Sequence, residues 1–443
     1  MEMQLPTWVQ DCMSALEQAG YAAFAVGGCV RDACLLKIPH DYDLCTDALP
    51  EETEQVFQNR RLVLAGVKHG TVGVITEGGP VEITTFRSEG TYGDNRHPDW
   101  VSFVPSVEED LSRRDFTINA MAWSPSRGFA DPFGGREDLK NGILRAVGEP
   151  DRRFREDALR ILRGIRFAVR FHLQVEEKTM EAMFHQAPLI RSLARERVFE
   201  ELCQVLLLTD EKAMQRFAPI LSEAIGELGP IVGFDQHTRY HAYDLYTHTA
   251  LVVSQVPADL TLRWAALLHD MGKIPTFTLD DQGQGHFYGH DRVGAEIGDR
   301  VLRSLKAPGV LRDQAVTLIA FHMKPLPLEK KQLRRRISRL GWEMTEKLFA
   351  LQKADLCSKG ADVREGLQQF AVLQSMMEAL RQEDACFRLS DLSVDGHDLM
   401  ALGLQGKEIG SCLQFLLEKV QDEVLPNERE ALLAEAKKQF CRE

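Results

Sequence analysis

The sequence lacks the features that mark membrane and secreted proteins. It contains no apolar run of about eighteen residues, and its start, MEMQLPTWVQDCMSALEQAGY, has the pattern of an amphipathic helix rather than a signal peptide. Its nine cysteines form no C-x-x-C pair, which argues for reduced thiols and against a zinc finger. We therefore expect a cytoplasmic protein with no membrane partner.

An excess of basic residues is also missing. The formal net charge is -13 at pH 7, so the composition alone does not indicate a nucleic-acid-binding protein. A global excess of acid says little about local fields, and the useful question is whether arginines cluster on one element. The 443 residues suffice for about two to four domains with ample core.

Residues 24–43, FAVGGCVRDACLLKIPHDYD, combine two patterns suited to nucleotide chemistry. A short apolar strand ends at a glycine pair, Gly27 and Gly28, where backbone N–H groups can approach a phosphate closely and Arg31 adds a cation. A second strand carries Asp41 and Asp43, which share a face because strand side chains alternate, and which can therefore hold divalent metal. Together these parts predict phosphoryl or nucleotidyl transfer assisted by two metal ions.

Each half of this pattern has a structural alternative, namely a tight glycine turn and a solvated strand edge. The order strand, GG, helix and D-x-D strand within about twenty residues favours a site. GGCVRD followed by HDYDL resembles the nucleotidyltransferases of the polymerase-beta superfamily, specifically class II CCA-adding enzymes and bacterial poly(A) polymerases. The resemblance implies two Mg²⁺ ions as cofactors.

Residues 63–87 alternate apolar runs with glycine turns and predict the remaining strands of a small sheet. Glu82, in VEITTF, is expected near the strand of the two aspartates, where a third carboxylate would complete the metal site. An outward-facing strand glutamate is the alternative. Residues 88–104 form a long polar loop with Tyr92, Arg96 and His97, and they resemble the flexible loop of CCA-adding enzymes.

The string RRDFTINA places adjacent cations, a carboxylate and an amide at the start of a helix, a chemistry suited to triphosphate and ribose. These residues are Arg113, Arg114, Asp115 and Asn119. A surface salt-bridge cluster is the alternative. The string is similar to the family's ribose-recognition motif, and DPFGGREDLKNGILRAVG, from Asp131, resembles the end of its catalytic domain.

Residues 151–171, DRRFREDALRILRGIRFAVRF, contain the arginine cluster. Helical spacing predicts a buried stripe and places Glu156, Arg160 and Arg163 on another face, with Asp157 one turn before Arg160. A salt bridge on a solvated helix is one interpretation. The other starts from base chemistry: cytosine and adenine each present an amino donor beside a ring-nitrogen acceptor, so a carboxylate next to a guanidinium fits C and A and mismatches U and G.

EDALRILRGIRF is very similar to the family's amino-acid template for the incoming nucleotide. The resemblance carries five residues into nucleotide binding: Glu156, Asp157, Arg160, Arg163 and Arg166. Residues 192–207 also resemble the family in Glu196-Arg197 and Glu200-Glu201-Leu202, and we expect this segment to brace the template helix.

Histidines become frequent after residue 230 and occur with aspartates in the order H, HD, H, H, D. This order, with HD followed by MGK, resembles HD-domain metal-dependent phosphohydrolases. The resemblance implies a site for a divalent transition metal at His248, His269, Asp270, His290, His322 and Asp355. His290 is preferred to His286 because HDRVGA fits the family's context, and His397-Asp398 is expected to start a helix.

The sequence thus predicts an α+β protein with a nucleotidyltransferase head at 1–145, a helical neck with the base-selecting helix at 146–215, a helical body with the HD-type site at 216–360 and a helical tail at 361–443. The tail resembles the tRNA-binding tail helices of CCA-adding enzymes. The predicted activity is template-independent addition of CCA to the tRNA 3′ end from CTP and ATP. A poly(A) polymerase, a partial CC- or A-adding enzyme, an HD phosphohydrolase with an inactive head and a non-catalytic RNA-binding protein are the alternatives. No protein partner is evident, and the oligomeric state stays open.

Overall fold

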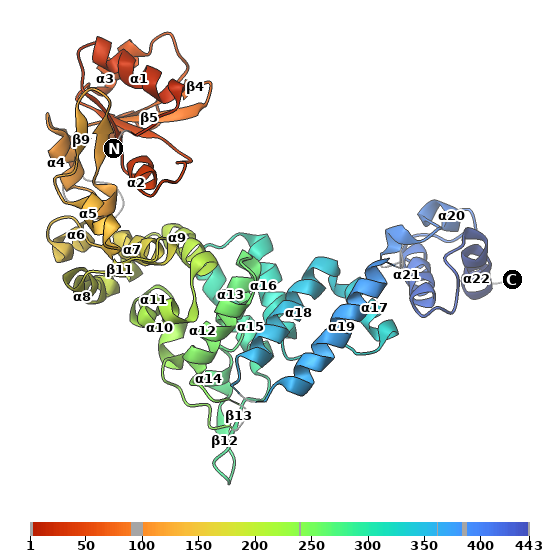
Figure 1. The fold of residues 1–443 in the computed structure, drawn as a ribbon. Helices are drawn as coiled ribbons and strands as arrows, with labels where there is room; N and C mark the ends of the chain where they lie inside the picture. The colour runs from red at the N-terminus through yellow and green to blue at the C-terminus, as the bar shows by residue number, and fades with distance from the viewer. Residues whose placement is uncertain (1–2, 90–100, 239–240, 361, 383–387, 442–443) are drawn as a thin grey trace. The chain divides into compact units, whose positions relative to one another are not determined.

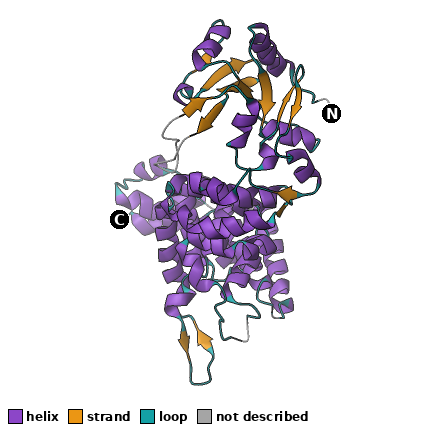
Figure 2. Ribbon diagram, turned by 90° about the vertical axis from the view of Figure 1, so that its left-hand side faces the viewer, coloured by secondary structure: helices purple, strands orange, loops and turns teal. Residues whose placement is uncertain are grey.

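The computed structural model describes residues 3–89, 101–238, 241–360, 362–382 and 388–441 (Figure 1). Its contacts divide the chain into two compact units. The first contains residues 1–209 and 216–229, and the second contains residues 210–215 and 230–443. Figure 2 shows the strands concentrated in one part of the chain and helices forming most of the rest, so the α+β class is confirmed.

The first unit is built on a seven-stranded sheet. Only β2 and β5 among its neighbouring strands run parallel, and the other pairs are antiparallel. In spatial order the strands are β3 (Leu62–Val63), β4 (Thr71–Thr76), β5 (Gly79–Thr85), β2 (Asp43–Thr46), β1 (Ala23–Val26), β8 (Ala122–Ser124) and β9 (Gly128–Ala130).

The sheet positions the predicted acidic residues. All four residues of β1 are buried, whereas β5 alternates, with Val81 and Ile83 buried and Glu82 exposed between them. In the parallel pair, Asp43 lies opposite Glu82, as the sequence predicted. Asp41 precedes β2 instead of belonging to it, because regular pairing starts at Asp43.

Helices continue the first unit beyond the sheet. They include α6 (Pro150–Glu156), α7 (Leu159–Arg170), α8 (Glu177–Gln186), α9 (Arg195–Leu208) and α11 (Ala218–Ala224). The prediction that Glu156, Asp157 and Arg160 share one helix was wrong. Asp157 has extended backbone angles, φ -145° and ψ 104°, which separate α6 from α7. The apolar stripe of α7 is nevertheless buried, with Leu162 and Ile165 almost inaccessible.

The second unit is almost entirely helical. Its central helices are α12 (Leu245–Gln255), α13 (Leu260–Leu268), α15 (His290–Ser304), α16 (Gly309–Phe321), α17 (Lys330–Leu340), α18 (Trp342–Cys357) and α19 (Arg364–Gln382). A hairpin of β12 (Thr278–Leu279) and β13 (Gly285–His286) projects between α13 and α15 in the chain. Eight of the nine residues of α13 are buried, Arg263 among them, and this burial fixes the position of the histidine that follows the helix.

The last helices, α20 (Gly396–Met400), α21 (Lys407–Gln421) and α22 (Arg429–Phe440), enclose an apolar core of their own. His397 and Asp398 lie in the first turn of α20, which Asp395 caps, so their interpretation as a helix start is confirmed. Among the residues that the structure describes, no helix has both the length and the apolar character that crossing a membrane requires.

Candidate active site and metal centre

One cavity of about 540 Å³ in the first unit gathers most of the residues predicted for nucleotide binding. Its lining contains Gly27, Gly28, Arg31, Asp41, Asp43, Arg113, Arg114, Asp115, Asn119, Asp157, Arg160, Arg163 and Arg166. Phe167, Arg170 and Arg197 complete the lining and were not predicted to belong to it. Two predicted residues, Glu82 and Glu156, lie outside the lining and contact residues within it.

The carboxylates form one corner of this cavity. Asp41 and Asp43 are exposed on either side of buried Tyr42, whose ring packs edge-on against Trp8 with 5.4 Å between centroids. The enclosing protein, the charge of Glu82 and the charge of Asp41 all raise the pKa of Asp43, and Arg114 only partly opposes them. Crowded carboxylates at one position fit a divalent cation, which relieves their repulsion.

The glycine turn brings the backbone against an arginine. Gly27 has φ +76°, and a Cβ atom there would lie 2.8 Å from Arg114 Nη1. Both the left-handed backbone and the close approach require glycine. The turn and the Arg114 guanidinium therefore face the same part of the cavity as the aspartates.

A chain of hydrogen bonds connects Arg31, beside the glycine turn, to α7 within the first unit. Arg31 Nη1 donates to Asn119 Oδ1 at 2.7 Å, and Asn119 Nδ2 donates to Asp115 Oδ1 at 3.1 Å. Arg163 Nε of α7 donates to the other oxygen, Asp115 Oδ2, at 2.8 Å. Burial opposes ionisation of Asp115, but the charge of Arg163 and the hydrogen bonds from Asn119 and Arg163 outweigh it and lower its pKa to about 2.

Asp110 holds the two neighbouring arginines, and the sequence analysis missed it. Its inaccessible carboxylate accepts hydrogen bonds from Arg113 Nε and Nη2 at 3.0 and 2.9 Å and from Arg114 Nη2 at 3.4 Å. Burial opposes its ionisation, yet Arg113 and Arg114 lower its pKa. No local signal distinguishes Asp110 from Glu108 and Glu109 beside it; only burial does.

Of the predicted base-selecting pair, Asp157 lies in the break between α6 and α7, and Arg160 lies in the first turn of α7. Asp157 Oδ1 accepts from the Leu159 N–H at 3.0 Å, and Oδ2 pairs with Arg197 at 3.2 Å. Arg160 Nη1 donates to Glu156 at 3.1 Å. Base selection by Asp157 and Arg160 stays a prediction, and the contact with Arg197 agrees with a bracing role for that residue.

Two arginines of α7 lie near Phe167. Arg166 pairs with Glu201 of α9 at 2.8 Å, and its guanidinium lies 4.6 Å from the Phe167 centroid, while that of Arg163 lies 5.4 Å from it. Arg31 lies 4.5 Å from the centroid of a second ring, Phe171. This part of the cavity lining is therefore cationic and is supported by aromatic rings. Tyr92, Arg96 and His97 of the predicted flexible loop lie outside the described residues.

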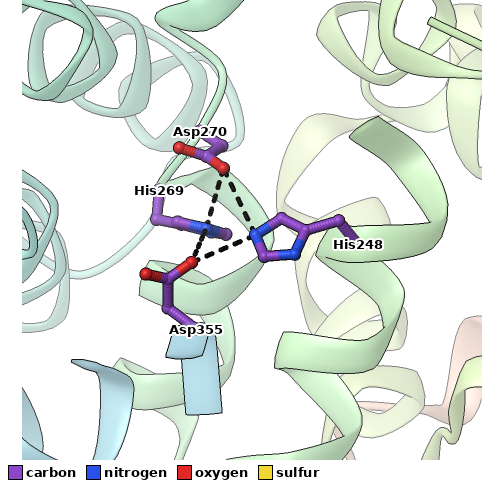
Figure 3. Close-up of side chains that lie close together, drawn as sticks. All are labelled: His248, His269, Asp270 and Asp355. Carbon is purple, nitrogen blue, oxygen red and sulfur yellow. Dashed lines mark ion pairs between the residues drawn. The ribbon is translucent and has the colours of Figure 1, made fainter. Parts of the chain in front are cut away.

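The second unit contains a separate cluster of histidines and aspartates. Figure 3 shows His248, the consecutive His269 and Asp270, and Asp355 converging from three segments of the chain. Asp270 and two further histidines, His290 and His322, form an adjoining group. All six predicted residues are thus brought together.

The two carboxylate oxygens of Asp270 point to different pairs of histidines. Its Oδ2 lies 3.4 and 3.2 Å from Nε2 of His248 and His269, and its Oδ1 lies 3.4 and 3.6 Å from Nε2 of His290 and His322. This arrangement has the donor set of a carboxylate bridging two metal ions. His286 is not part of it, because its Nε2 pairs with Asp280 at 2.9 Å.

The four histidines share one orientation. Each Nδ1 lies within hydrogen-bond distance of a backbone carbonyl: those of Ser358, Ala266, Phe287 and Ile319 for His248, His269, His290 and His322, at 3.2, 2.8, 2.8 and 2.6 Å. Each Nε2 is buried without a hydrogen-bond partner. Nδ1–H donation to a carbonyl leaves Nε2 as a lone-pair donor, so the cluster fits metal ligation.

A cavity of about 270 Å³ opens onto this cluster. Lys273 is buried beside it, with Nζ 2.8 Å from Asp270 Oδ2 and 2.8 Å from Gln236 Oε1. Lys359, which pairs with Asp355 at 3.0 Å, also lines the cavity. Ammonium groups beside metal ligands suit an anionic substrate such as a phosphoester.

Comparisons with known proteins were made with this geometry in hand. Residues 23–145 match the family described as Poly A polymerase head domain, residues 172–222 match Probable RNA and SrmB- binding site of polymerase A, and residues 238–360 match HD domain. A curated relative named CCA-adding enzyme from Levilactobacillus brevis is 34% identical over 95% of each chain. Another of the same name from Streptococcus pyogenes serotype M4 is 34% identical over 95% of this chain and 93% of its own length.

Solved structures agree with these relatives. The Bacillus stearothermophilus CCA-adding enzyme in complex with CTP aligns with a TM-score of 0.70 at 25% identity, covering 98% of each chain. The Thermotoga maritima CCA-adding enzyme complexed with tRNA aligns with a TM-score of 0.61 at 20% identity, covering 99% of this chain and 97% of that one. The second likeness supports the fold.

We predict a pH-dependent role in stability for Asp115. Because its pKa is depressed, its contribution is present above about pH 4 and is lost as the pH falls through about 2. Asp115→Asn should therefore lower the free energy of unfolding by about 2 kcal/mol at neutral pH, and this difference should shrink between pH 4 and 2. Urea unfolding across this range measures it. Asp11→Asn, on the exposed side of α1 (Thr7–Gln18), is the control, and equal losses in both variants would contradict the prediction.

The paired ligand groups predict two metal ions per chain in the second unit. We expect equilibrium dialysis with Mn²⁺ or Ni²⁺, in an Asp41→Ala/Asp43→Ala background, to give two ions per chain. His290→Ala should reduce this to one, whereas His286→Ala should leave two because His286 belongs to neither group. Equal retention of metal by the two variants would show that His290 is not a ligand.

Proposed function

Because the chain belongs to the CCA-adding enzyme family of nucleotidyltransferases, we propose that it adds CCA to the 3′ end of tRNA from CTP and ATP without a nucleic-acid template. One observation carries the proposal: the residues predicted for metal, triphosphate, ribose and base line one cavity, except Glu82 and Glu156, which contact residues of its lining. An inactive nucleotidyltransferase domain would not be expected to keep all these residues together in one cavity. Mg²⁺ is the proposed metal of the head.

Asp41 and Asp43, with Glu82 beside them, would hold two Mg²⁺ ions, which in such sites activate the attacking 3′-hydroxyl and stabilise the leaving pyrophosphate. The protein's own cations complement this charge. Arg31, Arg113 and Arg114 offer guanidinium groups to the triphosphate, and Asp110 holds two of them in place before the nucleotide arrives. Preorganised donors need little rearrangement when charge develops.

Asp115, Asn119 and Arg114 are proposed to place the ribose, and Asp157 with Arg160 to read the base. A base of the wrong kind would leave buried donors and acceptors facing like partners, at about 1 to 3 kcal/mol per unpaired group. Glu156 and Arg197 would act by holding Arg160 and Asp157 in position. A poly(A) polymerase would have a similar cavity, so only the reaction product distinguishes that alternative from a CCA-adding enzyme.

A second activity is proposed for the second unit, namely metal-dependent hydrolysis of phosphoesters at the six-residue cluster. The unpartnered Nε2 atoms and the lysines beside the cluster favour it. Its residues lie in a different unit from those of the nucleotidyltransferase cavity, so each activity should be removable without the other.

The proposed nucleotidyl transfer is tested with a tRNA ending at its discriminator base, given Mg²⁺ and CTP, ATP or both, with products resolved to single nucleotides. We expect two C and one A, then a stop. Asp41→Ala should reduce addition by at least about 100-fold and leave hydrolysis of p-nitrophenyl phosphate with Mn²⁺ intact, whereas His269→Ala should do the reverse. Asp11→Ala is the control for the head. Long A tails would indicate a poly(A) polymerase, and loss of both activities in either variant would refute independent sites.

Base selection is predicted to depend on Asp157. Asp157→Ala removes the acceptor that the amino groups of C and A require, so incorporation of UTP or GTP relative to CTP should rise about 5- to 150-fold, as expected for about 1 to 3 kcal/mol. Single-turnover kinetics with each nucleotide measures this ratio. Asp151→Ala on the same segment is the control. Unchanged ratios with a lower overall rate would assign Asp157 a structural role only.

A further inference from the structure

The end of α4 (Val107–Ser112) carries the arginines that are proposed to bind the triphosphate. Asp110, in the last turn of this helix, accepts hydrogen bonds from Arg113 and Arg114, which directly follow the helix. The backbone carbonyls at a helix end have no partner within the helix and need one elsewhere. The groups that bind the end of α4 therefore also fix the place from which these two arginines act.

Two further arginines, one on each side of Asp157 in the sequence, supply such partners. Arg153 Nη2, from α6, donates to the Ser112 carbonyl at 2.8 Å, and Arg160 Nη2, from α7, donates to the Arg113 carbonyl at 3.0 Å. Two consecutive carbonyls are thus held by two guanidinium groups. The segment that is proposed to read the base is in this way hydrogen-bonded to the segment that is proposed to bind the triphosphate.

Arg153 contacts three separate parts of the first unit. Besides the bond to Ser112, its Nε donates to the Val147 carbonyl at 3.3 Å and its Nη1 donates to Glu156 Oε2 at 2.7 Å. Only 12% of the side chain is exposed. A guanidinium carries its donors in one rigid plane, so these bonds determine its orientation, whereas a lysine ammonium is a single charge on a flexible stem. Lysine could therefore not reproduce this set of contacts.

Arg160 takes its position from Arg153. Its Nη1 donates to the Arg153 backbone carbonyl at 3.2 Å and to Glu156 Oε2 at 3.1 Å, and the same carboxylate oxygen accepts from Arg153 Nη1. Only 9% of the Arg160 side chain is exposed. Hydrogen bonds weaken steeply as their angle departs from linearity, so a donor that reads a base has to be placed accurately. A shift of Arg153 would therefore shift the donor that is proposed to read the base.

We propose that Arg153 is a positioning residue for base selection. It holds Arg160, through its own carbonyl and through Glu156, at a set distance from the arginines at the end of α4. A nucleotide bound by its triphosphate presents its base at a place that this distance has to match, because a small misplacement weakens an oriented contact strongly. Arg153 is not among the described residues that line the cavity, so it acts through Arg160. The inference rests on the proposed nucleotidyl transfer.

The test compares matched variants of the full chain. Arg153→Lys keeps the positive charge and the apolar stem but cannot make the three bonds together. Arg152→Lys is the matched control, because Arg152 is the neighbouring residue and its Nε pairs with the same carboxylate, at Glu156 Oε1 and 3.1 Å, with 77% of its side chain exposed. Ile220→Val removes one buried methyl group from α11 and shows the effect of lower stability alone.

Dissociation constants for CTP and UTP are measured by equilibrium dialysis with Mg²⁺ and without tRNA, so that no transfer takes place. We expect Arg153→Lys to lower the preference for CTP over UTP by about 2- to 10-fold, as expected when one hydrogen bond is weakened. Arg152→Lys and Ile220→Val should keep the preference of the wild type. Tripolyphosphate should bind to the wild type and to Arg153→Lys equally, because Asp110 still holds the triphosphate arginines.

A double variant shows whether Arg153 acts through Arg160. Once Arg160→Lys has removed the base-reading guanidinium, Arg153→Lys should lower the preference for CTP no further, because residues that share one interaction have non-additive effects. Glu156→Gln weakens the same connection from its other end and should lower the preference as Arg153→Lys does. This variant decides the question if Arg153→Lys does not fold.

Several results would overturn the proposal. They are an unchanged preference in Arg153→Lys, an equal decrease in Arg152→Lys or Ile220→Val, additive decreases in the double variant, and weaker binding of tripolyphosphate by Arg153→Lys. A wild type that binds CTP and UTP equally would overturn it as well. A wild type that prefers CTP but adds no nucleotide to tRNA would refute the proposed function, while the binding comparison still decides the role of Arg153.

Discussion

The nucleotidyltransferase cavity depends on the buried carboxylate of Asp115. One of its oxygens accepts a hydrogen bond from Asn119 and the other accepts one from Arg163. The side-chain oxygen of Asn119 in turn accepts a hydrogen bond from Arg31. Arg31 belongs to the helix after the glycine turn, Asn119 to the segment before β8, and Arg163 to α7. One carboxylate therefore connects the elements predicted to bind the triphosphate, the ribose and the base. Its low pKa reflects how strongly the surrounding donors favour the charged form.

Other arginines of the cavity are also held in place by carboxylates. Arginines on its wall are held by carboxylates behind them, Arg113 and Arg114 by Asp110 and Arg166 by Glu201. Each pair restricts a flexible side chain to one orientation, which lowers the entropy lost when a nucleotide binds. A net charge of -13 is compatible with a polyphosphate site because charge is arranged locally.

In the second unit, backbone carbonyls orient the histidine rings. Backbone carbonyls accept from Nδ1 in all four, so every Nε2 is directed to the carboxylate oxygens of Asp270 and Asp355 without the need for neighbouring acidic residues. Three of these carbonyls lie three residues before their histidine: those of Ala266 and Ile319 belong to the last turns of α13 and α16, and that of Phe287 precedes α15. The centre is therefore a property of how the helices end as much as of the ligands themselves.

The sequence by itself determined the parts whose relations are local. The glycine turn with Arg31, the aspartates on either side of Tyr42 and the order of the HD-type residues could be read from spacing, because strand alternation and helix periodicity fix neighbouring side chains. Tertiary structure decided the pairings between distant segments, Asp115 with Arg163 and Asp157 with Arg197, and the burial of Asp110 rather than Glu109. Even the break at Asp157 belongs to this group, since local spacing favoured one continuous helix. The physical reason is that packing of remote elements selects which polar groups are buried, and a buried group must find its partner wherever the fold places one.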